Sequence, residues 1–292
     1  MREQGDCGFL DRSLFCITGV VLVGALPIVL SGPLLHLRAI AQIGIALYFF
    51  ILRSPLFGPS LFMLVLSLTF LVRFPVSLWL FNLFLATAAY LAALLLYPSI
   101  RKHTGWLTPG RVSPADVLAG AAVVLLSAGA LFLWARGGLG AKIGSLTDGS
   151  LRASAGAASP GGGSPPRPVS PVGALPPFSN PLLLAAGVAG FALLNGAGEE
   201  VMFRGIYWDG LASLFRSPCA VVLAQALFFG LCHFRGFPGG PVGMGLSFLY
   251  GVVIGLIRHR TGGILAPVVA HVLTDAVIAI IVLTSAIPTS AP

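Results

Sequence analysis

Residues 181–204 read PLLLAAGVAGFALLNGAGEEVMFR, an apolar run that leads directly into two adjacent glutamates and an arginine. Ionised groups are expensive inside a membrane, and they usually serve function there. On a helix, Glu200 lies four residues before Arg204, the favourable orientation for an ion pair, whereas Glu199 lies about 100° away round the helix and has no local cation. We therefore predict that Arg204 neutralises Glu200 and that Glu199 stays free to accept a proton, as an acid–base catalyst must.

The composition around this stretch is that of a membrane protein. Hydrophobic residues make up 57% of the 292 residues and charged residues 9%, whereas a soluble domain has about 25% charged residues. The net charge is +8, but the seventeen lysines and arginines are scattered singly or in pairs between apolar runs. They indicate interfacial anchors and exclude a basic face for nucleic acid. The four cysteines show no CxxC spacing, which disfavours disulfides and thiolate metal sites.

The apolar runs predict an all-α fold, a polytopic membrane helical bundle of about eight to nine transmembrane helices, because each run approaches the roughly 20 residues that a spanning helix needs. Five runs in the first half carry no acid in mid-membrane and are interpreted as scaffold. Residues 181–215 are expected to form a single crossing. The predicted spans are 14–30, 33–52, 56–72, 75–97, 117–135, 181–215, 218–234, 242–257 and 264–287.

A change in composition divides the chain. Residues 137–180 are rich in glycine, serine and proline, which predicts a flexible aqueous loop. The predicted organisation is therefore a set of N-terminal transmembrane scaffold helices at 1–136, the loop at 137–180, and a functional domain at 181–292.

Three helical segments of this last domain present polar groups inside apolar sequence: Glu199 with Glu200 and Arg204, then His233, then His271 with Asp275. Buried charges without partners cost several kcal/mol each, so we predict that these groups converge on one cavity. The alternatives are a structural ion pair between Glu200 and Arg204, and a histidine that is only hydrogen-bonded at a helix end.

The other polar residues of the apolar runs are interpreted as structural. Asp209 is expected at the surface or at a helix end, and Arg258-His259-Arg260 at the membrane interface. Four further residues are interpreted as holding neighbouring helices together: Ser67, Asn82, Thr87 and Gln225.

Three motifs, Glu199-Glu200-x-x-x-Arg204, Phe229-x-x-x-His233 and His271-x-x-x-Asp275, occur in this order on separate predicted helices. Together they resemble the motifs of the CAAX-processing and bacteriocin-processing intramembrane protease family, which includes the prenyl-protein endopeptidases, over residues 181–287. The resemblance implies that Glu199 is the catalytic glutamate, that Glu200 and Arg204 support it, that His233 helps to activate water, and that His271 and Asp275 complete the site. In the prenyl-protein branch the last motif usually ends in asparagine, and Asp275 departs from that pattern.

Peptide hydrolysis needs a nucleophile, and the second half shows no Gly-x-Ser-x-Gly or comparable signal for an activated serine or cysteine. Water activated by Glu199 and a histidine is the simplest alternative. It needs either no cofactor or one divalent metal such as zinc, held by Glu199, His233, His271 and Asp275. The zinc signature His-Glu-x-x-His is absent.

These observations predict a peptidase, an intramembrane endopeptidase that cuts a membrane-associated peptide or protein near the membrane interface. Its partners are that substrate and the lipid bilayer, with no nucleic acid. The expected location is a multi-pass position in a membrane, the plasma membrane if the protein is bacterial. The alternatives are a proton- or ion-coupled transporter with a Glu/His/Asp relay, and a non-catalytic membrane scaffold.

Overall fold

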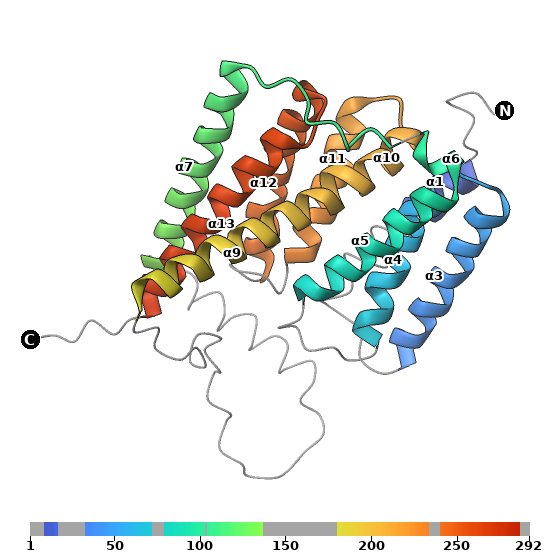
Figure 1. Ribbon diagram of the computed structural model, residues 1–292, viewed down its shortest axis with the longest axis horizontal. Helices are drawn as coiled ribbons and strands as arrows, with labels where there is room; N and C mark the ends of the chain where they lie inside the picture. Colours follow the sequence, from blue (N-terminus) through green and yellow to red (C-terminus); the bar gives the residue numbers. More distant parts are fainter. Residues whose placement is uncertain are drawn as a thin grey trace, which may run out of the picture.

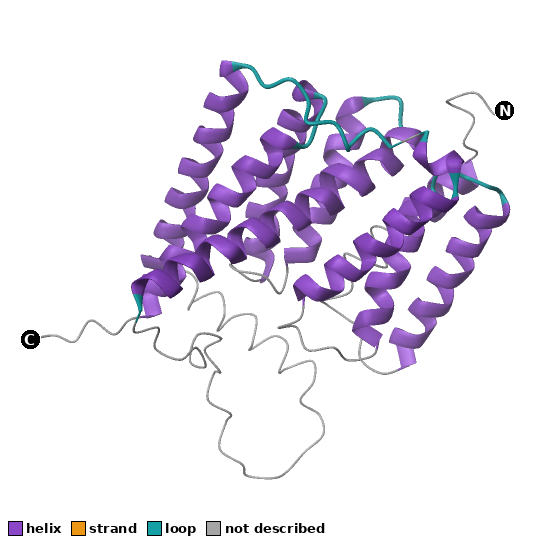
Figure 2. Cartoon of the chain, in the orientation of Figure 1, coloured by secondary structure: helices purple, strands orange, loops and turns teal. Residues whose placement is uncertain are grey.

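The computed structural model describes residues 9–16, 33–71, 79–102, 104–136, 180–233 and 240–286, and within these ranges it contains helices and no β-strand (Figures 1 and 2). The predicted all-α fold is confirmed. Most of the predicted span 14–30 and nearly all of the predicted loop 137–180 lie outside the described residues.

One group of helices comes from the N-terminal part of the chain. It contains α3, α4 and α5, in which α4 packs against both α3 and α5. Figure 1 shows this group, coloured blue to teal, at one end of the molecule. Its helices are α1 (Phe9–Cys16), α3 (Pro33–Ile51), α4 (Phe57–Leu71), α5 (Trp79–Leu96) and the short α6 (Pro98–Arg101).

A second group joins one helix from the N-terminal part to the C-terminal helices. Helix α13 packs against both α7 and α9, and α11 packs against α12. Helix α7 was predicted as part of the scaffold, and it lies among the C-terminal helices in Figure 1. The helices of this group are α7 (Pro114–Arg136), α9 (Pro181–Glu200), α10 (Trp208–Leu214), α11 (Pro218–Cys232), α12 (Gly240–Thr261) and α13 (Leu265–Ala286).

The residues from Pro181 to Leu214 form one continuous helical element, as expected for a single crossing. Asn180 caps it, because its side-chain oxygen accepts from the backbone N–H of Leu182 at 2.9 Å, and Pro181 occupies the first turn. Between α9 and α10 the helix expected over residues 181–215 contains a π-helical segment, η3 (Val201–Tyr207). Short π-helical stretches are frequent at functional sites.

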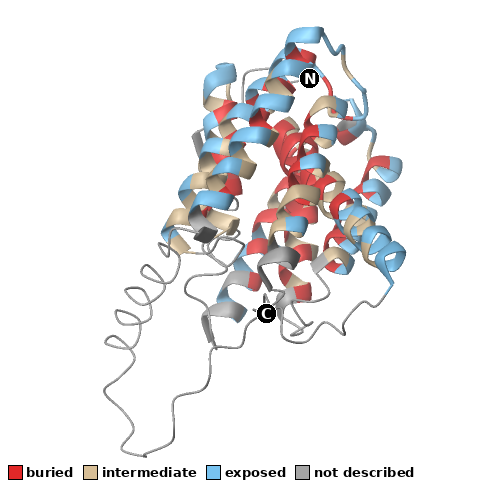
Figure 3. Ribbon diagram, turned by 90° about the vertical axis from the view of Figure 1, so that its left-hand side faces the viewer, coloured by how far each residue is buried: buried red, intermediate tan, exposed pale blue. Residues whose placement is uncertain are grey.

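Among the residues that the structure describes, three helices are long and apolar enough to cross a membrane: Pro114–Leu133, Pro181–Leu214 and Gly240–Thr261. Five shorter apolar helices accompany them: Ala39–Ile51, Phe57–Thr69, Leu80–Leu96, Pro218–Cys232 and Leu265–Ile281. Large apolar side chains such as Leu125 and Leu182 are exposed on the outer surface, and Figure 3 shows the exposed positions on the outside of the bundle with the buried positions between the helices. Such a surface suits lipid, so the protein is a membrane protein.

A loop of residues 104–113 docks on the turn between α12 and α13 and thereby places α7 beside them. The backbone N–H of Arg111 donates to the Thr261 carbonyl at 2.8 Å. Asp209, predicted at a surface or helix end, is partly buried and accepts from the backbone N–H of Gly105 at 2.6 Å. It therefore joins α10 to this loop.

The four residues predicted to hold helices together behave in three ways. Gln225 donates from α11 to the Gly251 carbonyl of α12 at 2.7 Å, as expected. Ser67 and Thr87 instead donate to the carbonyls of Met63 and Leu83 in their own helices, because a hydroxyl on a helix reaches the preceding turn more easily than a neighbouring helix. The buried amide of Asn82 has no hydrogen-bond partner within the described part of the chain.

Candidate active site

The end of α9 and the η3 segment set Glu200 against Arg204. Nη1 of Arg204 donates to Oε1 of Glu200 at 2.8 Å, and both side chains are fully buried. The same oxygen accepts from Nδ1 of His271 on α13 at 2.6 Å. The Arg204 guanidinium also lies 4.5 Å from the centroid of the Phe229 ring on α11, a cation–π contact. The predicted ion pair is therefore present, and it links α9 through η3 to α11 and α13.

Arg258 stabilises the backbone of this segment. Its Nε donates to the Arg204 carbonyl at 2.9 Å, and its guanidinium lies 5.5 Å from the Trp208 ring centroid. The side chain is 5% exposed, so the prediction that Arg258 is an interfacial anchor is wrong. The backbone hydrogen bonds within a π-helix differ from those of an α-helix, and a nearby arginine is well placed to bond a carbonyl of this segment.

Glu199 lies between the two imidazoles. Its Oε2 is 3.9 Å from Nε2 of His233 and 3.8 Å from Nε2 of His271. This oxygen is buried and has no hydrogen-bond partner among the described residues. Polar atoms separated by more than about 3.5 Å are often bridged by water, so the three atoms form a suitable place for one.

Hydrogen bonds on the far side of each ring orient both imidazoles. Nδ1 of His233 lies 2.7 Å from the carbonyl oxygen of Phe229, which can only accept, so Nδ1 carries the hydrogen. Nδ1 of His271 likewise donates to the Glu200 carboxylate. Both Nε2 atoms are thus directed toward Glu199, with the tautomer fixed by the opposite hydrogen bond.

Asn195 joins two of the carboxylates, and the sequence analysis did not identify it. Its Nδ2 donates to Oε1 of Glu199 at 3.2 Å and to Oδ2 of Asp275 at 3.0 Å. The available signal was its position four residues before Glu199 on one helix, where side chains meet. Asn195 holds one Glu199 oxygen and leaves the other facing the imidazoles.

Asp275 does not accept the Nδ1–H of His271. Glu200 accepts from Nδ1 instead, and Oδ1 of Asp275 lies 3.6 Å from Nε2, on the side of the ring that faces Glu199. The structure therefore brings all six predicted residues together. Among the three carboxylates, Glu200 is the one that accepts hydrogen bonds from both Arg204 and His271.

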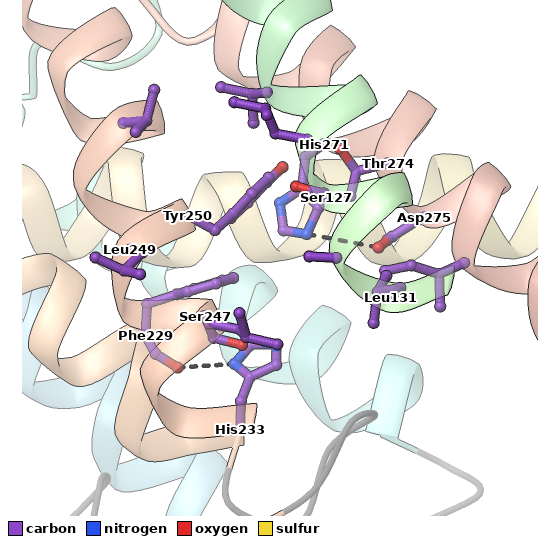
Figure 4. Close-up of a pocket in the computed structure, with 16 residues that line it drawn as sticks. Ser127, Leu131, Phe229, His233, Ser247, Leu249, Tyr250, His271, Thr274 and Asp275 are labelled. Carbon is purple, nitrogen blue, oxygen red and sulfur yellow. Dashed lines mark hydrogen bonds and ion pairs between the residues drawn. The ribbon is translucent and has the colours of Figure 1, made fainter. Parts of the chain in front are cut away.

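A cavity of about 310 Å³ opens beside these residues, between α7, α11, α12 and α13. Figure 4 shows His233, His271 and Asp275 around it. Glu199 is not among the lining residues and is 7% exposed, whereas the two imidazoles within 3.9 Å of its Oε2 do line the cavity. The catalytic chemistry predicted for this site would take place where the cavity meets those rings.

A divalent metal is one cofactor that the donor set suggests, since two imidazole nitrogens and two carboxylates surround one position. Ligand atoms around tetrahedral zinc are about 3.3–3.6 Å apart, from bond lengths of about 2.0–2.2 Å. Here one separation, 3.6 Å, lies at the upper end of this range, but the two from Glu199 to the imidazoles, 3.8 and 3.9 Å, exceed it. No group of three or more such side chains in the described ranges is arranged to hold a metal. The chemistry of the donors suits zinc, but their spacing is too wide, so we route no step through a metal.

Comparison with known proteins relates part of the chain to a family. No curated protein and no solved structure matches the chain. Residues 181–277, about a third of the chain, match the family model described as "Type II CAAX prenyl endopeptidase Rce1-like". All six predicted site residues fall within this range, whereas α7 lies outside it. The family resemblance is therefore confirmed for this segment: residues 181–277 match an Rce1-like domain and are similar to the type II CAAX prenyl endopeptidases.

Proposed function

We propose that the protein is an intramembrane endopeptidase of the CAAX-protease and bacteriocin-processing type, which hydrolyses a peptide bond near the membrane interface with water activated by Glu199 and a histidine. The family match supports an intramembrane protease. The observation that carries the finer proposal is Oε2 of Glu199, which is buried without a hydrogen-bond partner in the described residues and lies within 3.9 Å of two imidazole Nε2 atoms.

In this mechanism a water molecule occupies the position between these three atoms. Glu199 takes one proton from it as the water oxygen bonds to the carbonyl carbon of the substrate, and the π electrons of the carbonyl move to its oxygen. The water is oriented by its second hydrogen, which it donates to one of the Nε2 atoms. The tetrahedral intermediate then re-forms the carbonyl and breaks the C–N bond, and the leaving nitrogen receives the proton from Glu199. The products are a carboxyl group and an amine.

The remaining residues position these groups. Asn195 holds the Glu199 carboxylate, and Glu200 with Arg204 holds His271. In this proposal residues 181–292 form the protease domain and residues 1–136 the scaffold, from which α7 completes the cavity. The substrate is a membrane-associated peptide or protein, and the enzyme crosses the membrane several times, in the plasma membrane if it is bacterial. Neither the contacts nor the comparisons support the transporter.

The test uses the full-length protein in lipid vesicles with a library of membrane-tethered peptides, and mass spectrometry of the products. Glu199→Gln is nearly isosteric and is expected to lower the cleavage rate by about 10²–10⁴-fold, the usual contribution of a general base. Asp116→Asn makes the same chemical change at a buried acid that bonds Ser113, away from the site, and should retain activity. Cleavage by Glu199→Gln at the wild-type rate would end the proposal. Metal analysis of the active protein decides whether zinc takes part.

A further inference from the structure

Helix α7 forms one wall of the cavity, although it lies outside the family-matched segment. Figure 4 shows two of its side chains, Ser127 and Leu131, together with His271 and Asp275 among the residues that line the cavity. The α7 wall consists of Val123, Leu126, Ser127, Ala130 and Leu131. The chain thus adds its own surface to a site whose catalytic residues all belong to the matched domain.

The cavity has a polar part and an apolar part. His233, His271 and Asp275 form the polar part, whereas nine of the sixteen lining residues are apolar, including four of the five on α7. A volume of about 310 Å³ is at the small end of the roughly 300–1,000 Å³ of ligand pockets. This size suits one side chain and its adjoining backbone better than a long segment.

Two small side chains on α7 leave room in the cavity, and their size sets its width on that side. Ser127 and Ala130 are three residues apart on the helix, so they lie on one face, and both line the cavity. Each is only partly buried, so its side chain borders the cavity without being enclosed by protein. A larger side chain at position 127 or 130 would extend into the cavity, because both residues line it directly.

We infer that the α7 wall is a substrate subsite that takes one apolar side chain next to the scissile bond, and that Ser127 and Ala130 set the largest side chain it accepts. The inference rests on the proposed function. A carbonyl that reaches the Nε2 atoms of His233 and His271 enters a cavity that both residues line, and the adjoining side chain then meets the apolar wall of α7.

The experiment compares peptides that differ only in the residue beside the scissile bond, from alanine through valine and leucine to phenylalanine. Ala130→Leu is expected to lower kcat/KM for the phenylalanine peptide at least about tenfold, while the alanine peptide changes less than about twofold, since one methylene in an apolar pocket is worth about 10- to 200-fold. The matched control is Ala122→Leu, the same change eight residues earlier on α7, at an exposed position that does not line the cavity. Its size profile should equal that of the wild type.

Leu126→Ala provides the opposite change without removing a buried side chain, because Leu126 is 73% exposed and lines the cavity. It should raise kcat/KM for the phenylalanine peptide relative to the alanine peptide. Equal profiles for Ala130→Leu and Ala122→Leu, or an equal fall for all peptides with no shift in Leu126→Ala, would overturn the subsite. If Glu199→Gln abolishes cleavage while α7 variants leave the size profile unchanged, only this inference fails. If Glu199→Gln cleaves normally, the proposed function fails first.

Discussion

The two helix groups have similarly apolar helices, and in both some hydroxyls bond carbonyls of their own helix, but the second group adds a set of polar contacts between helices. In α4 and α5, Ser67, Thr69 and Thr87 donate to carbonyls of their own helices, three or four residues back. In the group formed by α7 and α9–α13, Thr274 does the same, but Asn195 and His271 bond Asp275 and Glu200 on other helices. The first group has a bond between helices from Tyr48 to Asp11, but no charged network like that around Glu200 in its described residues. A bond within one helix selects no neighbour, whereas a bond between helices fixes their relative positions. The candidate site therefore lies where polar side chains of different helices form hydrogen bonds and ion pairs with one another.

The sharpest difference between the groups is the buried ion pair, so its removal should have the largest effect. Arg204→Ala leaves Glu200 and its shared bond to His271 without a cation, and breaking a buried pair typically costs about 3–5 kcal/mol. We expect a large fall in thermal stability in detergent, together with loss of activity. Arg260→Ala is the matched control, because Arg260 is 59% exposed and pairs with Asp116 at 3.3 Å. Asp116 is buried but keeps its hydrogen bonds from Ser113 when Arg260 is replaced, so we expect a loss of only about 0–1 kcal/mol, as for surface pairs. Equal effects of the two variants would contradict this difference between the groups.

Asn195 tests the link between α9 and α13. Asn195→Ala removes the donor to both Glu199 and Asp275 and leaves two buried carboxylates without it, a loss of about 1–3 kcal/mol for an unsatisfied buried group. Peptide cleavage should fall about 10- to 100-fold, mainly in kcat, because the Glu199 carboxylate loses its orientation. Asn195→Gln, which keeps the amide, should recover part of the rate. An unchanged kcat in Asn195→Ala would show that the amide does not position Glu199.

Asp275→Asn tests whether the site needs the negative charge of Asp275. The amide oxygen of the substituted side chain can still accept from Asn195, but the negative charge 3.6 Å from Nε2 of His271 is lost. We expect activity to fall by about tenfold, the lower end for groups that support a catalytic residue, with no change in metal content. Joint loss of bound metal and activity would instead identify Asp275 as a ligand, and full activity would remove any need for its charge.

The smallest effect is expected in the first group. Ser67→Ala removes a hydroxyl that bonds only the Met63 carbonyl of the same helix, and such back-bonding contributes little to helix stability. Thermal stability and cleavage should both stay near wild type, within about 0.5 kcal/mol for the free energy of unfolding. A loss as large as that of Asn195→Ala would show that Ser67 also holds a neighbouring helix, against the comparison on which these predictions depend.

Several features of the protein follow from the sequence alone, because they depend on local spacing. The all-helical fold follows from the length of the apolar runs, and the continuous helical element Pro181–Leu214 from their composition. The pair Glu200–Arg204 follows from a separation of one helical turn. The scarcity of charge in apolar sequence was enough to predict that Glu199, His233, His271 and Asp275 gather, because each needs a partner.

Which helix faces meet depends on packing between helices, which local sequence does not encode. Helix α7 is apolar all round, so no amphipathic stripe indicated that it lines the cavity with α12 and α13. The bonds of Asn195 to Asp275 and of Arg258 to the Arg204 carbonyl join residues 80 and 54 positions apart, and no periodicity encodes such a distance. In a membrane, the apolar surface that lipid covers and the apolar surface that another helix covers have the same composition. The arrangement of the site therefore depends on packing and polar contacts between helices and not on local sequence.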